Sequence, residues 1–394
     1  MIALLLSPIY IIINIYVIRW LIRWMESCSK YFKNKISKII IITIYTFFAS
    51  SFIIGFFLPI RIIKVIGNYW LGVVQYIIIT VILADLIRII LIKINKIDPK
   101  ILHSRKVFAI NGLICIIIVS LVSTYGVFHA DKIVSRNYDV VIDKEVPKLD
   151  TLKVSLVSDL HLGYNSTTYH ITKMVNLINE FNPDIVIIAG DIFDNDYDAI
   201  SNPDKVIKAL KKIKSTYGTY AVFGNHDIDE SILAGFTFTW KNNKGTSDKR
   251  MNQFLVDSNI TLLQDNCLLI DNAINLCGRL DYHKLGMDIE RRKTPIELLQ
   301  DIDKDKPVIV IDHEPKELEE LSLAGVDIDL SGHTHDGQMF PSNVFLHMFS
   351  KNPHGVIKVN DMTSAVTSGI GVYGPNMRVG TTAEVMNLNI TFKK

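Results

Sequence analysis

The chain has 394 residues, of which 49% are hydrophobic, and its mean hydropathy is +0.26. This composition is too apolar for one ordinary soluble domain. The formal net charge is only +2, and the excess of lysine and arginine lies beside apolar segments, so charge gives no support for a nucleic-acid-binding protein.

Four apolar segments account for the excess, and all of them lie before residue 130. They cover about residues 2–22, 39–60, 69–92 and 107–129, each close to the ~20 residues that a membrane-spanning helix needs. No basic residue precedes the first segment, as one would in a cleavable signal peptide, so we expect this segment to be retained. The sequence predicts a transmembrane region of four helices over residues 1–130 and a second domain over residues 131–394.

Basic residues concentrate in the loops after the first and third apolar segments. Residues 23–38 contain five lysines or arginines, residues 93–106 contain five more, and the loop between the second and third segments carries only Arg61 and Lys64. The positive-inside rule places the two basic loops in the cytoplasm. We therefore expect a multi-pass protein of the cell membrane whose second domain is extracytoplasmic.

Asp85 and Arg88 are charged residues inside the third apolar segment. Charges at this depth can mark a polar path through a helix bundle. They can also form an ion pair on one helix face, with the arginine reaching toward the cytoplasmic surface. The spacing of three residues favours the ion pair.

Two of the four cysteines, Cys267 and Cys277, flank the stretch LLIDNAINL. This stretch predicts a hairpin that would place the two thiols opposite each other, as in a disulfide of an exported domain. Two buried thiols are the favoured alternative, because cysteine is commonly buried without a bridge.

After residue 150 the sequence alternates between apolar runs and helical segments. The runs LKVSLVSD, PDIVIIAGD, GTYAVFGN, KPVIVIDH and VDIDLSGH predict buried strands, and residues 169–181 and 204–214 have helical character. Before them, YDVVI predicts an edge strand. This alternation is typical of a layered α/β fold.

The five apolar runs share the kind of residue that follows them. Each is followed by side chains that bind metals: Asp159 and His161, Asp191, Asn225 and His226, His313, and His333 and His335. In α/β sheets, functional groups gather at the carboxyl ends of strands. Taken singly, an aspartate can be a helix cap, Asn-His a turn, and His-x-His two solvated loop histidines. Five such ends in order favour one shared site.

The donor types predict which metals would bind. Two aspartates, one asparagine and four histidines, leaving His226 aside, are too rich in imidazole for calcium or magnesium and lack the thiolates of structural zinc sites. Manganese, iron or zinc fits better. Seven donors exceed the needs of one ion, so we expect two divalent metal ions that share a carboxylate, as in enzymes that attack phosphorus.

The ordered motifs SDLHLG, GDIFD, GNHD, an isolated His313 and SGHTHDGQ resemble the five blocks of the calcineurin-like metallophosphoesterase superfamily. The tail GVYGPNMRVGTTAEVMNLNIT is similar to a bacterial membrane-associated, phosphodiesterase-like branch of it. The resemblance implies a four-layer α/β sandwich, preceded here by the four-helix transmembrane region.

The resemblance also implies a role for each residue. One ion would be held by Asp159, His161 and His335, and the other by Asn225, His313 and His333, with Asp191 bridging the two. His226 would be catalytic, next to the leaving oxygen, and Asp194 would orient it. Water activated by the ions would attack phosphorus.

Other residues near the motifs have less defined roles. We expect Asp227 to be a structural carboxylate and Tyr164, Asn165 and Glu314 to lie close enough to touch the substrate. Asp336 stands where the family turn more often has a glycine.

Arg378 and Glu384 match the tail of the branch. A packed surface ion pair would explain these two residues equally well.

The resulting hypothesis is a membrane-anchored, metal-dependent phosphoric ester hydrolase for phosphodiester or pyrophosphate bonds, with lipid-linked or envelope substrates as candidates. The alternatives are a phosphoprotein or other phosphomonoester phosphatase, or a metal-binding membrane receptor or transport component without catalysis. Phosphoprotein phosphatases usually carry a glutamate where GNHD ends, and a non-catalytic protein would be expected to lose Asp191 or His226. We expect a phosphate ester and the membrane as partners and no nucleic acid, and the sequence leaves the oligomeric state open.

Overall fold

The computed structural model describes residues 2–58, 60–94, 98–147, 149–233, 236–237, 248–285 and 291–393. The chain divides into two compact units. The helical unit combines Met1–Phe128 with Ile232–Phe238 and Gly374–Met377, and the sheet unit contains the remaining residues. This division follows contacts and includes two segments from later in the chain, so it does not test a boundary in the sequence. The expected domain limits at residues 130 and 131 stay a prediction.

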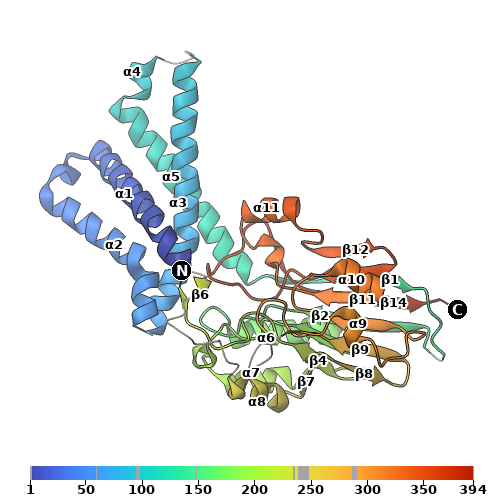
Figure 1. The fold of residues 1–394 in the computed structure, drawn as a ribbon. Helices are drawn as coiled ribbons and strands as arrows, with labels where there is room; N and C mark the ends of the chain where they lie inside the picture. The colour runs from blue at the N-terminus through green and yellow to red at the C-terminus, as the bar shows by residue number, and fades with distance from the viewer. Residues whose placement is uncertain are drawn as a thin grey trace. The chain divides into compact units, whose positions relative to one another are not determined.

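Four long helices dominate the helical unit (Figure 1). They are α1 (Ile2–Cys28), α2 (Lys35–Phe57), α3 (Arg61–Lys93) and α5 (Arg105–Ala130). Two short helices, η1 (Lys30–Lys33) and α4 (Pro99–Leu102), and the hairpin β5 (Ile232–Leu233) and β6 (Phe236–Thr237) complete it. The long helices match the four apolar segments, except that α2 ends at Phe57 before the expected limit near residue 60, and they are long and apolar enough to cross a membrane, as predicted. Of the expected basic residues, Lys96 lies outside the described residues.

The four helices bury few of their side chains against one another. At most 17% of the residues in each apolar window are buried, so isoleucines and leucines cover the outside of the bundle. Such a surface is favourable in lipid and costly in water. Inside, the Tyr45 hydroxyl donates to Asn14 Oδ1 (2.7 Å) and the Trp70 Nε1–H donates to the Tyr10 hydroxyl (3.1 Å).

Asp85 and Arg88 pair with each other on α3. Arg88 Nη2 lies 3.2 Å from Asp85 Oδ1, as the ion-pair reading predicted.

Two mixed six-stranded sheets form the sheet unit. The first has the order β1 (Ile133–Ile142), β14 (Ala383–Phe392), β2 (Thr151–Val157), β3 (Ile185–Ala189), β4 (Thr219–Val222) and β7 (Ile260–Leu262). The second has the order β12 (Gly355–Val359), β13 (Met362–Val366), β11 (Ile328–Ser331), β10 (Val308–Ile311), β9 (Ile274–Gly278) and β8 (Asn266–Ile270). Strands β2, β3, β4 and β7 are parallel, as are β9, β10, β11 and β13. The predicted edge strand is part of β1, which lies at the edge of the first sheet beside β14.

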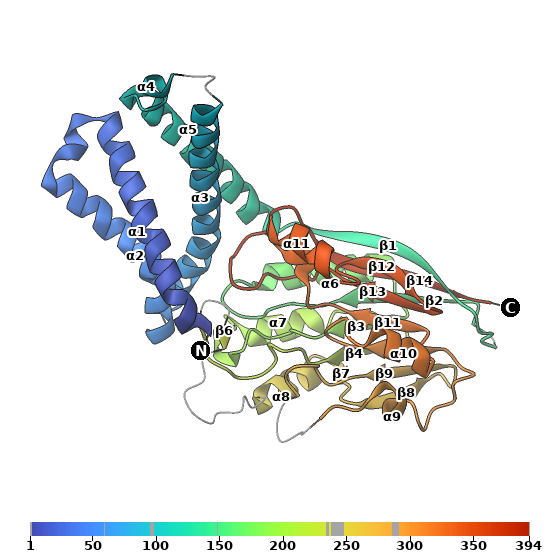
Figure 2. The ribbon, with the colours of Figure 1, turned by 45° about the horizontal axis from the view of Figure 1, so that its top comes forward.

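Helices cover the outer face of each sheet (Figure 2). Those on the first sheet are α6 (Thr168–Phe181), α7 (Pro203–Leu210) and α8 (Lys249–Asp257), and those on the second are α9 (Pro295–Leu298) and α10 (Leu318–Ala324). The turns η2 (Tyr197–Ala199) and η3 (His335–Gly337) and the helix α11 (Ser342–Phe349) lie in the connections. The segment 204–214 was expected to be helical throughout, but α7 ends at Leu210.

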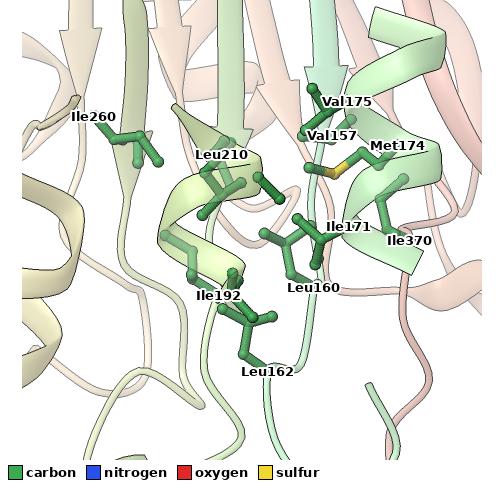
Figure 3. Close-up of a cluster of buried hydrophobic side chains, with 14 of the residues drawn as sticks. Val157, Leu160, Leu162, Ile171, Met174, Val175, Ile192, Leu210, Ile260 and Ile370 are labelled. Carbon is green, nitrogen blue, oxygen red and sulfur yellow. The ribbon is translucent and has the colours of Figure 1, made fainter. Parts of the chain in front are cut away.

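Alternation along the central strands creates three apolar cores. In β3, Val186 and Ile188 face α6, α7 and α8, whereas Ile185 and Ile187 face the second sheet. In β10, Val308 and its i+2 neighbour face α9 and α10. Figure 3 shows part of the first core, where side chains of α6 pack on strand and loop residues. The order is therefore helix, sheet, sheet, helix, and the predicted four-layer sandwich is confirmed.

The predicted hairpin is formed by β8 and β9, which place Cys267 directly opposite Cys277. The two residues form a disulfide. The favoured expectation of two buried thiols is therefore wrong. The antiparallel register brings the two Cα atoms to 4.0 Å, so that their sulfurs can meet.

Asp329 is a buried carboxylate on β11 that should make stability depend on pH. Its Oδ1 has no hydrogen-bond partner among the described residues, and burial, reinforced by Asp312, raises its pKa to about 7. The folded chain then holds a proton that the unfolded chain releases near pH 4, so stability is lost as the pH rises toward 7. The shift from 3.8 limits this loss to about 4 kcal/mol.

We expect Asp329→Asn to remove most of this loss, since an amide does not ionise. The measurement is thermal unfolding in detergent at pH 5 and pH 8, followed by circular dichroism, with exposed Asp361→Asn as the control. An equal loss of melting temperature in wild type and Asp329→Asn would contradict the prediction.

Candidate metal centre

The five predicted motifs lie at the carboxyl ends of five strands. Loops after β2, β3 and β4 carry the first set of candidate ligands, and loops after β10 and β11 carry the rest. These residues are Asp159 and His161, Asp191, Asn225 and His226, His313, and His333 and His335. Because the strands of each set are parallel, the loops meet along one edge of the sandwich.

One group of donors comprises Asp159, His161 and His335. Their donor atoms all lie within 4.8 Å of one another, and the three residues are buried. His161 Nε2 is 3.1 Å from His335 Nε2, which is 3.4 Å from Asp159 Oδ1. The predicted set for one ion is thus brought together.

A second group comprises Asp191, His313 and His333, again with donor atoms within 4.8 Å. His313 Nε2 lies 3.2 Å from Asp191 Oδ2 and 3.2 Å from His333 Nδ1. Asn225 joins them, because its Oδ1 is 3.1 Å from His313 Nε2 and 3.0 Å from His333 Nδ1.

Asp191 connects the two groups. Its Oδ2 is 3.2 Å from His313 Nε2 and 3.8 Å from His161 Nε2. Its other oxygen accepts the backbone N–H of His226 (2.8 Å), which fixes the carboxylate. Asp191 therefore stands where a bridging ligand is expected.

The chemistry of the donors fits a pair of cations. His313 Nδ1–H donates to the Ala189 carbonyl (2.8 Å), so its Nε2 is the ring nitrogen that faces the oxygens of Asp191 and Asn225 and is available to a cation. Acceptors this close repel unless positive charge lies between them. Burial disfavours the charged imidazole, yet Asp191 raises the pKa of His313 well above its usual value. In the first group, Asp159 Oδ1 is buried without a hydrogen-bond partner within the described ranges.

The donors stand on an unusual backbone. Five of the seven expected ligands have positive φ, namely Asp159, His161, Asp191, His333 and His335. Non-glycine residues adopt this conformation at a cost of about 1–3 kcal/mol each, and such residues cluster at functional sites. The sharp turns direct side chains from neighbouring loops toward one another, so that their donor atoms form the two groups.

His226 is part-buried beside the two groups. Its ring lies tilted against the ring of Tyr373, with centroids 4.2 Å apart, and its Nδ1 bonds Asn195 Oδ1. The Asn195 Nδ2 donates to the Ile228 carbonyl (3.1 Å), so the Asn195 oxygen must face His226 and accept its Nδ1–H. Burial lowers the pKa of His226 to about 4, which leaves a lone pair on Nε2 in the neutral ring.

Asp194 was expected to orient His226, and this role stays a prediction, because the structure shows no direct contact between the two among the described residues. Asp194 Oδ1 instead lies 3.5 Å from Nδ1 of His161, while Asn195 contacts His226. The reason is the turn after β3, in which consecutive side chains diverge. Asp194 thus orients a metal-ligand candidate.

The neighbouring residues divide into structural and lining groups. Asp227 is structural, as predicted, because it accepts the backbone N–H groups of Phe193 and Gly224 (2.7 Å each). Glu314 is buried between His283 Nδ1 and His333, whose Nε2 is 3.7 Å away.

Two further expected neighbours lie beside the site. Tyr164 donates to Asp196 (3.4 Å), and Asn165 is buried.

Arg378 and Glu384 are both fully buried, so the surface ion pair expected for them is wrong. Arg378 Nη2 donates to the carbonyls of Ser368 and Gly371 (2.8 Å each). Glu384 accepts the backbone N–H of Ser368 (3.1 Å). Both side chains therefore hold one loop, which is bonded to Asp159 through the Gly371 N–H (2.7 Å).

Asp336 adopts φ 53°, the left-handed conformation that explains the glycine more often found at this position. Its carboxylate pairs with His347 Nε2 (2.6 Å). A partner on α11 therefore binds the extra carboxylate.

Sequence reasoning missed three residues of the site: Tyr373, Asn195 and His283. Tyr373 lies within the quoted tail, but its tyrosine carried no signal of a contact with His226. Asn195 follows GDIFD directly, and His283 belongs to no motif.

Fold and site together define an α/β sandwich with a two-part metal centre. The family model described as "Calcineurin-like phosphoesterase" matches residues 152–337. The chain therefore contains a calcineurin-like metallophosphoesterase domain, as the resemblance implied.

Similar proteins include an uncharacterized metallophosphoesterase of Campylobacter jejuni, 32% identical over 64% of this chain and 63% of its own length. A "Transmembrane protein with metallophosphoesterase domain" of Danio rerio is 28% identical over 70% of this chain and 62% of its own. The chain thus spans less than two thirds of these relatives. The solved structure of GAP50 from Plasmodium is 14% identical, covering 59% of this chain and 77% of its own, with a TM-score of 0.32 that supports no argument.

Gly332 gives a test of the metal centre. A Cβ there would lie 1.8 Å from Ser158 Oγ and 2.7 Å from Asp159 Oδ2. We expect Gly332→Ala to reduce bound metal from about two ions per chain to about one or none, because Asp159 must move. The measurement is elemental analysis after loading with manganese.

Gly355→Ala is the matched control, since its Cβ meets nothing within 4 Å and its φ of +93° adds only backbone strain. Full metal content in Gly332→Ala would show that Asp159 does not hold an ion.

Proposed function

We propose that the chain is a metal-dependent phosphohydrolase that cleaves phosphodiester or pyrophosphate bonds. The observation that carries the proposal is the position of Asp191 Oδ2 between two groups of imidazoles. A shared carboxylate between two cation sites is the arrangement used for in-line attack on phosphorus. The metallophosphoesterase domain supports the same reaction class.

Two divalent ions of the manganese, iron or zinc type, when bound, would bind phosphoryl oxygens and make water acidic enough to attack. One would be held by Asp159, His161 and His335 and the other by Asn225, His313 and His333. Asp191 keeps the two sites together. The hydrogen bond to the Ala189 carbonyl fixes the tautomer of His313, and Asp194, 3.5 Å from His161 Nδ1, favours the orientation of that ring.

His226 is proposed to donate a proton to the leaving oxygen. With Nδ1–H held by Asn195, Nε2 can donate only when the ring is protonated. Burial lowers the pKa of His226, but the negative charge of a bound phosphate would raise it again. The ring of Tyr373 packs against His226 and limits its rotation, so the proton is delivered along one direction.

The first test is hydrolysis by the purified full chain with manganese. We expect turnover of bis(p-nitrophenyl) phosphate, and a loss of about 100-fold or more in Asp191→Asn and in His226→Ala, because each removes a group needed in the transition state. His103→Asn, on an exposed histidine, is the matched control and should keep full activity.

Unchanged turnover in both variants would refute the proposed site. Preference for p-nitrophenyl phosphate over the diester would favour the phosphomonoester phosphatase instead.

We further infer that the catalytic domain is extracytoplasmic and acts on lipid-linked or envelope phosphates. The two basic loops between the long helices support this orientation. The Cys267–Cys277 disulfide supports it independently, since disulfides persist in oxidising compartments. The similar transmembrane protein and the four apolar helices support a site near lipid.

The second test is topology. Alkaline phosphatase fused after Lys394 is expected to be active in intact cells, because the C-terminus would be exported. Cys267 and Cys277 should resist maleimide labelling until a reductant is added, whereas exposed Cys28 serves as the internal cytoplasmic control. An inactive fusion would place the domain in the cytoplasm.

A further inference from the structure

A cavity of about 370 Å³ lies wholly within the helical unit. It is lined by α1 between Ile12 and Arg23, by the C-terminal half of α3 and by the start of α5. Arg105 Nε donates to the Ser27 carbonyl (2.7 Å), which holds the start of α5 beside the end of α1. The cavity volume falls in the range of about 300–1,000 Å³ that small-molecule sites occupy.

Three arginines, Arg19, Arg23 and Arg88, line this cavity. Arg19 and Arg23 are one helical turn apart, so they project from the same face of α1. Neither forms an ion pair with any described residue, although Glu26, one turn further along, pairs with Lys38 (2.6 Å). Charged side chains in a membrane helix are costly without a partner, so their convergence indicates a bound anion.

Asp85 is the acidic residue in the cavity wall, and it is already engaged. It pairs with Arg88 (3.2 Å) and accepts the Tyr16 hydroxyl hydrogen bond. The wall therefore keeps a net charge of +2 from Arg19 and Arg23.

Trp20 provides an independent sign of a missing ligand. Its side chain lines the cavity and is only 8% exposed, yet its Nε1–H has no hydrogen-bond partner in the described part of the chain. The ring is fixed edge-on against Phe108, with centroids 6.0 Å apart. A buried indole N–H normally finds an acceptor.

The opposite end of the cavity is apolar. Ile12 and Ile15 lie one to two turns deeper along α1, on the face that carries Arg19. Both isoleucines are exposed, at 66% and 44%. A cationic end at the level of the helix termini and an apolar end deeper in the bundle match a lipid, with its phosphate at the interface and its acyl chains below.

We propose that this cavity binds the phosphate of an anionic glycerophospholipid. The three arginines surround the phosphate, Trp20 donates a further hydrogen bond, and one acyl chain lies along the apolar end. With the orientation inferred above, the lipid comes from the cytoplasmic leaflet. The site does not depend on the proposed hydrolysis, so a chain without activity can still bind lipid here.

The test is titration of the purified full chain, in neutral detergent, with dioleoyl phosphatidylglycerol, followed by native mass spectrometry. We expect Arg19→Gln combined with Arg23→Gln to weaken binding about tenfold or more, because two charge-assisted hydrogen-bond donors are lost. Trp20→Phe keeps the ring and removes one donor, and should weaken binding about threefold or more.

Lys30→Gln combined with Lys33→Gln is the matched control, since it removes two exposed charges from the adjacent loop. It should change affinity less than about twofold. Unchanged binding in the arginine variant, or an equal loss in the lysine variant, would overturn the proposal. Inorganic phosphate in about 100-fold excess should not displace the lipid; displacement would show a site for free anions instead.

Discussion

The carboxylate of Asp191 lies between two groups of imidazoles, and it is the residue that connects the two parts of the donor set. Donor atoms from several loops lie within 4.8 Å of one another in each of the two groups, a crowding of polar atoms that positive charge among them stabilises in a low-dielectric interior. The parallel strands of the two sheets supply these loops at one edge. Each side of the sandwich brings part of the donor set, so the two sheets must pack correctly before the centre exists.

The layered packing also sustains the backbone conformation of the centre. Five of the expected ligands have positive φ, an unfavourable conformation that the surrounding apolar cores hold in place. Arg378 and Glu384 extend this support, because both bind the loop at Ser368 beside Asp159. Buried charges that hydrogen-bond to the backbone fix a loop more firmly than apolar contacts alone.

The apolar side chains of the two units are removed from water in different ways. In the sheet unit, apolar side chains are buried from water in three hydrophobic cores. The long helices bury little among themselves, so lipid must cover their isoleucines, and polar residues inside the bundle have to find partners there. Asp85 has two partners, Arg88 and Tyr16. Arg19 and Arg23 on α1 have no ion-pair partner among the described residues, and this is the reason for proposing a ligand in the cavity that they line.

The sequence by itself determined the elements and the donors. Apolar runs of about 20 residues or of strand length reveal helices and strands through local periodicity, and ordered Asp and His residues at strand ends identify the centre. Only the tertiary structure decided which side chains meet: Asn195 rather than Asp194 beside His226, and a disulfide joining Cys267 to Cys277. Periodicity specifies the face on which a residue lies, but the partner it meets depends on turn geometry and on packing between segments far apart in the chain.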